Sequence, residues 1–234
     1  MSDPGRWRVR DPYPPPGGRA RALAIVLVLV VAGGLGYALF ALPLQAEGLS
    51  GAVAGRIAQS GVSHPVTAVL LNFRGYDTWL ELAVLLLALV AAWSLGLPPL
   101  GPEPAPGPVL DRLTRLILPL MILVAGYLLW VGAQAPGGAF QAGAVLGAAG
   151  VLLLLDGWRL PRGLAGWPLR LLLVLGVAVF AAVGVAAIAL GGVLLQYPPG
   201  AAGGLILLIE AAATLAIGVT LAALFHGSRP EDDP

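Results

Sequence analysis

The sequence predicts an all-α, polytopic bundle of about six transmembrane helices, and three observations predict it. Of its 234 residues, 58% are hydrophobic, and the mean hydropathy is +0.89. Only 11% are charged, whereas a typical soluble domain carries about 25%. Finally, six apolar runs are each long enough to cross ~30 Å of hydrocarbon, which takes about 20 helical residues.

The six apolar runs follow one another along the chain. They cover residues 21–43, 66–97, 115–133, 138–156, 169–195 and 202–225. The first is longer than the apolar core of a signal peptide, which has about 7–15 residues, so we expect an uncleaved helix. The second would measure about 48 Å at 1.5 Å per residue. It must therefore tilt strongly or break, and Gly75 offers the break.

Arginine placement predicts the orientation. Lysine is absent, so arginine supplies every basic side chain except histidine. Arginines gather before the first run, in the connections 98–114 and 157–168, and after the last run, whereas Arg56 and Arg74 alone fall on the other side. Because basic connections stay cytoplasmic, both termini are predicted to be cytoplasmic.

Composition also divides the chain into segments. Six prolines in "GLPPLGPEPAPGPVLD" cannot continue a helix, and the Pro-, Gly- and Arg-rich start has no apolar period. The predicted segments are a disordered cytoplasmic tail (1–18), a two-helix module (19–97), a Pro-rich linker (98–111), a four-helix module (112–226) and a C-terminal tail (227–234).

The stretch "NFRGYDTWLE" (72–81) places three ionisable groups at the edge of an apolar run. Arg74, Asp77 and Glu81 are spaced i, i+3 and i+7, so a helix presents them on one face. Arg74 can pair with Asp77, while Glu81 lies one turn deeper. A carboxylate there tends to hold a proton or find a cation. Two interpretations stay open: an ion pair that anchors a helix end, with Glu81 reaching the headgroups, or a proton or cation site facing the bundle interior.

Glu210 lies in "LLIEAAATLAIG", near the middle of the last run. Its short stem prevents it from reaching the membrane surface, and Thr214, four residues on, can share its face. The alternatives are a protonated side chain that only joins helices and a titratable station in an ion path.

The stretch "AQAPGGAFQAGAVLG" (133–147) opens the fourth run. The Pro-Gly-Gly of residues 136–138 breaks the backbone, and Gly143 and Gly147 form a GxxxG pattern that permits close helix contact. Gln141 is the polar residue at the start of this run. By spacing alone, this stretch is typical of a helix-packing turn.

Several function classes are excluded. The sequence has no phosphate-binding glycine loop, no nucleophile elbow and no metal-ligand cluster, so we expect neither an enzyme nor a cofactor. Cysteine is absent and the net charge is only +1, so cysteine-ligated metal sites and nucleic-acid binding are not expected. His64, His226 and Asp156 fall at the ends of runs, where interfacial roles are expected.

Two motifs resemble a known family. "HPVTAVLLNFRGYDTWLELAVL" (64–85) resembles the C-terminal segment of the A subunit of Mrp-type cation/proton antiporters, which also exists as the separate E subunit of membrane-bound hydrogenases. The matching residues are Phe73, Arg74, Gly75, Tyr76, Asp77, Thr78 and Glu81. Asn72 stands where the family usually has Asp, and Leu80 where it usually has Gly.

"APGGAFQAGAV" (135–145) and "LLIEAAATLAIG" (207–218) resemble the two signatures of the antiporter B subunit. The matching residues are Pro136, Gly137, Gly138, Phe140, Gln141, Gly143, Ile209 and Glu210. Ala139 and Ala142 replace glycines. The resemblance thus covers an E-like module followed by a B-like module on one chain.

This resemblance implies an accessory subunit of an Mrp-type Na⁺ or K⁺/H⁺ antiporter in a prokaryotic plasma membrane, whose partners are the other subunits, the lipid and the transported ions. The implied ion-path candidates are Glu81, Glu210, Asp77, Arg74, Thr214 and Gln141, with Gly75, Pro136, Gly137, Gly138, Phe140 and Gly143 as structural residues. The alternatives are the same subunit type in a redox-driven complex such as a membrane-bound hydrogenase, and a structural scaffold that transports nothing.

Overall fold

The structure, a computed structural model, describes residues 17–42, 48–95, 107–198 and 200–227. It separates into two compact units, Met1–Gly48 and Leu49–Pro234. Nearly all of the predicted C-terminal tail and of the predicted disordered tail, and most of the predicted linker, lie outside the described residues. All regular structure in the described part is helical, as predicted.

The first unit contains one described helix, α1 (Gly18–Phe40). Its alanine, leucine and valine residues favour a helix, and none of its residues is buried. Apolar side chains cover it all round, which is typical of a helix that needs lipid or other helices as its surroundings.

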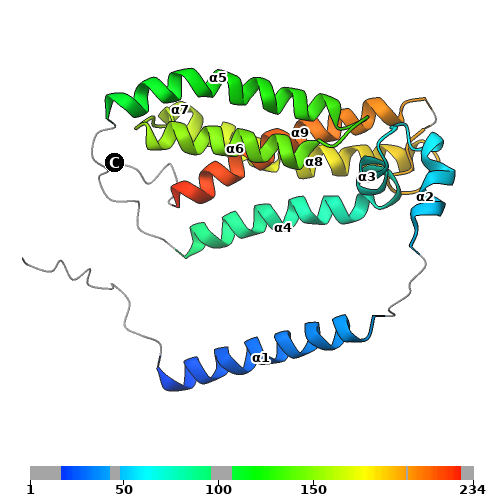
Figure 1. The fold of residues 1–234 in the computed structure, drawn as a ribbon, viewed down its shortest axis with the longest axis horizontal. Helices are drawn as coiled ribbons and strands as arrows, with labels where there is room; N and C mark the ends of the chain where they lie inside the picture. The colour runs from blue at the N-terminus through cyan, green and yellow to red at the C-terminus, as the bar shows by residue number, and fades with distance from the viewer. Residues whose placement is uncertain (1–16, 43–47, 96–106, 199, 228–234) are drawn as a thin grey trace, which may run out of the picture. The chain divides into compact units, whose positions relative to one another are not determined.

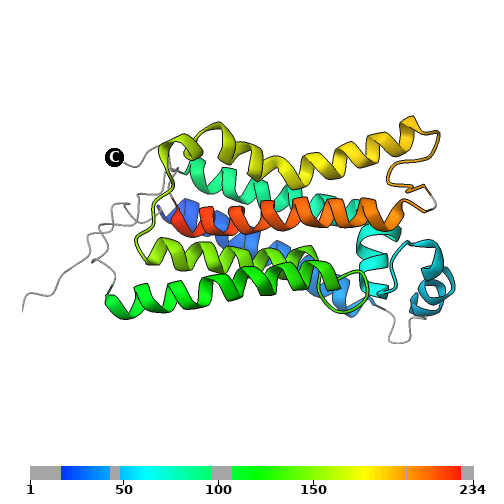
Figure 2. The same cartoon turned by 90° about the horizontal axis from the view of Figure 1, so that it is seen from above.

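The second unit holds the remaining helices, drawn in Figures 1 and 2. They are α2 (Ser50–Arg56), the 3₁₀ turn η1 (Ile57–Gln59), α3 (Pro65–Ala68), the π-helix η2 (Val69–Phe73), α4 (Gly75–Ser94), α5 (Pro108–Val131), α6 (Ala139–Leu155), α7 (Arg162–Ala165), α8 (Trp167–Ala189) and α9 (Ala202–His226). Helix α9 lies at the centre, where it packs against α6, α8 and α4 (Figure 2).

Five described helices are long and apolar enough to cross a membrane: α1, α4, α5, α8 and α9. Helix α6 is apolar but has only 17 residues, which gives about 26 Å. The six predicted runs therefore correspond to six apolar helices, of which α6 is the shortest because it begins only after the Pro-Gly-Gly turn. The orientation of the bundle stays a prediction.

The overlong second run is broken, which is one of the two outcomes, a strong tilt or a break, that its length predicted. Helix α3 passes into the π-helix η2, which ends at Arg74 with φ −131° and ψ 32°. Helix α4 then begins at Gly75 and has 20 residues, enough for one crossing. The break lies at Arg74 and Gly75, where the sequence suggested it.

The predicted close contact at the GxxxG pattern is confirmed. Gly143 and Gly147 are buried against α9. A Cβ atom added to Gly143 would lie 2.7 Å from Cβ of Ile217, and one on Gly147 would lie 2.8 Å from Cβ of Leu221. Only glycine allows the two backbones to approach this closely.

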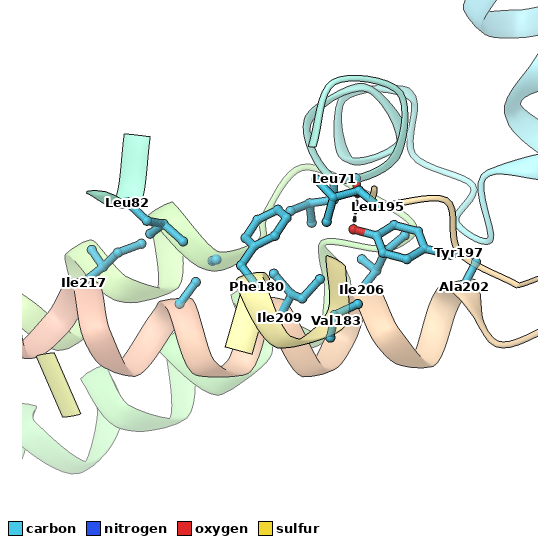
Figure 3. Close-up of a cluster of buried hydrophobic side chains, with 12 residues drawn as sticks. Leu71, Leu82, Phe180, Val183, Leu195, Tyr197, Ala202, Ile206, Ile209 and Ile217 are labelled. Atoms are coloured by element: carbon cyan, nitrogen blue, oxygen red, sulfur yellow. Dashed lines mark hydrogen bonds between the residues drawn. The ribbon is translucent and has the colours of Figure 1, made fainter. Parts of the chain in front are cut away.

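The main hydrophobic core joins the segment before α5 to the helices that follow it. Figure 3 shows Leu71 near Phe180 and Leu82 beside Ile217 of α9, all within one buried cluster. The Tyr197 hydroxyl donates to the Leu71 carbonyl over 2.8 Å. Residues from 49 onward therefore pack as one unit, although the motifs predict a module boundary at the Pro-rich linker.

Candidate functional site

The turn between α5 and α6 is built from glycine. The Gly138 N–H donates to the Leu128 carbonyl over 2.8 Å, so the chain folds back onto α5. A Cβ atom on Gly137 would lie 2.5 Å from that same carbonyl oxygen. Gly138 has a φ of +102°, a left-handed conformation that favours glycine. The turn therefore fixes where α6 begins.

The start of α6 meets the carboxylate of Glu210. Glu210 lies on the central helix α9 and is only 3% exposed. The Ala139 N–H, the first of α6, donates to its carboxylate. A Cβ atom on Gly138 would lie 2.7 Å from Oε1 of Glu210, so the absence of a side chain there makes room for the carboxylate. We call Glu210, Gly138 and Ala139 the Glu210 site.

One carboxylate oxygen of Glu210 stays without a partner. Oε2 is buried and has no hydrogen-bond partner among the described residues. An acidic side chain at the centre of a membrane helix costs roughly 2.5–3.5 kcal/mol. The N-terminus of α6 offsets part of this cost, by up to about 2 kcal/mol in buried geometries. A proton on Oε2 would remove the buried charge, so the chemistry that this arrangement offers is the gain and loss of a proton.

The other polar candidates nearby take different positions. The Thr214 hydroxyl donates to the backbone carbonyl of Glu210 over 2.7 Å and is thus directed away from the carboxylate. Gln141 is exposed, and its Oε1 lies 3.9 Å from where a Cβ atom on Gly138 would stand. Phe140 packs against the main core, and Pro136 is exposed. Gln141 is therefore the second polar side chain that approaches Gly138.

The cluster on α4 has a different environment. Arg74 and Asp77 form an ion pair, and their side chains are 67% and 44% exposed. Glu81 is exposed as well. Glu81 therefore faces away from the other helices of the second unit, because Leu82 and Thr78 occupy the face of α4 that is buried there, and the role of Glu81 stays a prediction. Gly75 is buried, and a Cβ atom there would make ordinary contact with Leu195, at 3.5 Å.

Sequence reasoning missed the hydrogen bonds that hold η2 and α4. The Thr78 hydroxyl donates to the Leu70 carbonyl over 2.7 Å, and the Trp79 indole N–H donates to the Val177 carbonyl over 3.1 Å. The Tyr197 hydroxyl donates to the Leu71 carbonyl from the α8–α9 connection, more than a hundred residues further along the chain. Burial raises the pKa of the Tyr197 phenol. A single tyrosine between two apolar runs carries no sequence signal of this contact.

The remaining candidates occupy helix ends. Asp156 caps the C-terminus of α6, and His226 is the last residue of α9, as predicted. The side chain of His64 contacts the Thr67 hydroxyl at 3.3 Å. Within the described residues, no three His, Asp or Glu side chains come together to hold a metal ion.

Comparisons with known proteins identify the family of the chain and structures with a similar fold. A family model described as a domain related to the MnhB subunit of Na⁺/H⁺ antiporter matches residues 109–225. No curated protein matches the chain. Two solved structures are similar, and both are under 25% identical, so they establish the fold alone.

The first is a chain of the membrane-bound sulfane sulfur reductase, an archaeal respiratory membrane complex. It is 24% identical with a TM-score of 0.66, and the match covers 89% of this chain and 97% of that one. The second is a chain of the Mrp complex from Dietzia sp. DQ12-45-1b. It is 23% identical with a TM-score of 0.62, and the match covers 95% of this chain but only 27% of that longer one.

Proposed function

Since the chain belongs to the family of domains related to the MnhB subunit of Na⁺/H⁺ antiporters, we propose that it is an accessory membrane subunit of an Mrp-type antiporter. The complete complex exchanges Na⁺ or K⁺ for H⁺ across a prokaryotic plasma membrane. This chain supplies one helical bundle and at least one titratable carboxylate, and its partners are the other membrane subunits.

The observation that carries this proposal is the Glu210 site. A carboxylate that is buried at the centre of the bundle, with one oxygen held by the Ala139 N–H and the other unpartnered, suits alternating occupancy. In one state Oε2 carries a proton, and in the other it faces a cation or a water molecule. The fixed N–H of α6 stabilises the ionised form between the two states.

The extent of one structural match supports a finer proposal, that an E-like module precedes the B-like one in this chain. The Mrp chain from Dietzia is similar to 95% of this chain along a single polypeptide. That extent reaches beyond the MnhB-related residues 109–225. The Phe-Arg-Gly-Tyr-Asp-Thr motif lies in the additional part, between α3 and the first turns of α4.

A second candidate function is the same subunit role in a redox-driven ion pump. It is favoured by one observation: the match to the sulfane sulfur reductase complex covers 97% of that chain, so a polypeptide of similar extent exists there as a separate subunit. Subunits of the purified complex, identified by mass spectrometry, distinguish the two. Redox subunits beside the antiporter-like ones would favour the second candidate.

The decisive experiment is Glu210→Gln in the complete complex. Glutamine keeps the shape and the hydrogen-bonding capacity but releases no proton. We expect normal assembly and a cation-dependent proton flux in vesicles at least tenfold below wild type, with partial flux and a shifted pH profile in Glu210→Asp. Wild-type flux from Glu210→Gln would contradict a titrating role for Glu210 and leave its carboxylate only the task of joining helices. The isolated chain in liposomes, as a control, is expected to exchange no ions.

A further inference from the structure

Two segments far apart in the sequence meet at the turn between α5 and α6. The backbone N–H groups of Ser63 and His64 both donate to the Ala133 carbonyl, over 2.9 and 3.0 Å. In the short helix α3 that follows, the Thr67 hydroxyl donates to the Gly132 carbonyl. The loop before α3 and the first turn of α3 therefore hold the beginning of the α5–α6 turn from outside these two helices.

Thr67 differs from the buried threonines of α9. Thr214 and Thr220 donate to carbonyls four residues earlier in their own helix, which is a common bond for a threonine inside a helix. Thr67 is 5% exposed and donates instead to a carbonyl 65 residues away in the sequence. Its hydroxyl thus joins two segments of the chain.

The imidazole of His64 supports this hydroxyl from the other side. Nδ1 of His64 lies 3.3 Å from Oγ1 of Thr67. A threonine hydroxyl has a single proton, and Thr67 gives it to the Gly132 carbonyl. Nδ1 must therefore donate in the contact with Oγ1, so the hydrogen bonds run from His64 to Thr67 and from Thr67 to Gly132.

Gly132 carries this constraint to the Glu210 site. A Cβ atom on Gly132 would lie 2.6 Å from both Cα and N of Gly138, so the two backbones are in contact. Gly138 in turn borders Oε1 of Glu210. The next residue, Ala139, donates its N–H to the same carboxylate. A displacement of Gly132 would therefore displace the N–H group that holds Glu210.

We propose that Thr67 is a positioning residue for the Glu210 site, with His64 holding its hydroxyl in place. The hydroxyl fixes the Gly132 carbonyl, and the turn held in this way keeps the Ala139 N–H directed at the Glu210 carboxylate. Because that N–H favours the ionised carboxylate, the bond made by Thr67 sets how readily Glu210 releases its proton. This role in proton release rests on the proposed function of Glu210, whereas the role in positioning rests on the contacts alone.

Hydrogen exchange in the complete complex tests the positioning. Thr67→Val keeps the shape of the side chain and removes the hydroxyl. We expect the amides of residues 138–142 to exchange about tenfold faster than in the wild type, because the turn opens more often. Thr67→Ser keeps the hydroxyl and should restore wild-type exchange. Wild-type exchange of residues 138–142 in Thr67→Val would overturn the proposal.

Two further variants make this measurement specific. The matched control is Thr220→Val, which removes a buried hydroxyl that bonds within α9 and should leave the exchange of residues 138–142 unchanged. Thr67→Cys replaces the hydroxyl by a thiol, a weak donor, and takes the place of Thr67→Val if that variant assembles poorly. Its exchange should then lie above that of Thr67→Ser, and equal exchange in the two would overturn the proposal.

Proton flux tests whether the turn acts through Glu210. Thr67→Val should lower cation-dependent flux about threefold in the wild-type background but no further in Glu210→Gln, because both changes act on one carboxylate. Equal fractional losses in the two backgrounds would overturn a role through Glu210. Failure of the proposed function looks different: Glu210→Gln would then keep wild-type flux, while the exchange of residues 138–142 would still respond to Thr67→Val.

Discussion

Glu210 and Glu81 are the same residue type in two apolar helices, yet their surroundings are opposite. Glu210 is 3% exposed and accepts a hydrogen bond from the start of α6, whereas Glu81 is exposed on the outside of α4. A carboxylate of the first kind is served by its own chain. Glu81 is turned away from the other helices of the second unit, and lipid offers a carboxylate no hydrogen-bond partner.

Depth does not explain this difference. Both helices begin at the same end of the second unit: Gly61 touches Ala202 at the start of α9, and Tyr197 bonds Leu71 just before α4. The difference comes from position in the bundle. Helix α9 is surrounded by α6, α8 and α4, whereas the buried residues of α4 (Gly75, Thr78, Leu82 and Leu89) lie along one side of that helix. The comparison shows that the packing of a helix, and not its composition, sets the surroundings of a charge within it.

The largest effect is expected in a test of membrane orientation, which decides on which side of the membrane both carboxylates lie. A cysteine is either reached by an impermeant reagent or not. Cysteines at Ser50 and Gln196, both exposed at the end nearer the two carboxylates, should react with an impermeant thiol reagent added to whole cells. Cysteines at Gly107 and Gly227 should not. The cysteine-free chain gives no background. Reversed labelling would contradict the arginine-based orientation and place both carboxylates nearer the cytoplasm.

Gly138→Ala should disturb the Glu210 site. The new Cβ atom would lie 2.7 Å from Oε1 of Glu210, at a φ of +102° that alanine rarely adopts. We expect proton flux by the complex to fall about tenfold, with lower thermal stability. The matched control is Gly126→Ala in α5, where a Cβ atom meets nothing within 4 Å. This variant should keep the proton flux and the thermal stability of the wild type. Equal behaviour of the two variants would show that the carboxylate needs no close approach at Gly138.

Arg74→Ala tests the charged cluster at the start of α4. It leaves Asp77 without its ion-pair partner at the edge of the membrane, which is costly once a partner subunit excludes water. We expect two- to fivefold less assembled complex, measured by recovery of tagged chain with its partners. Arg115→Ala removes the similarly exposed Asp111–Arg115 pair and should change assembly little. Normal assembly of Arg74→Ala with lost flux would instead assign Arg74 to the ion path.

Tyr197→Phe should have the smallest effect. It removes the hydrogen bond to the Leu71 carbonyl and leaves that oxygen buried, at a cost of about 1–3 kcal/mol. The apparent melting temperature of the chain in detergent should fall by several degrees. Tyr127→Phe, at a side chain that is 61% exposed, should leave it unchanged. A melting temperature unaffected by Tyr197→Phe would mean that packing alone holds η2 against the α8–α9 connection.

The sequence by itself determined the properties that depend on composition and local spacing. The apolar runs predicted the helices, the excess length of 66–97 predicted a strong tilt or a break with Gly75 as the break point, and the GxxxG pattern indicated that close helix contact is possible at Gly143. These features follow from the hydrophobic effect and from backbone geometry, which act on neighbouring residues. The motifs also identified Glu210 and the Pro-Gly-Gly turn as separate elements, with no sign that they touch.

Only the tertiary structure decided which polar groups meet. It brought Gly138 and Ala139 onto Glu210, directed Thr214 to a backbone carbonyl, and turned Glu81 outward. A helix that is apolar on every side has no hydrophobic face to indicate what it packs against. In such a chain the close approach of glycine-bearing backbones selects the neighbours, and that approach depends on pairs of residues far apart in the sequence.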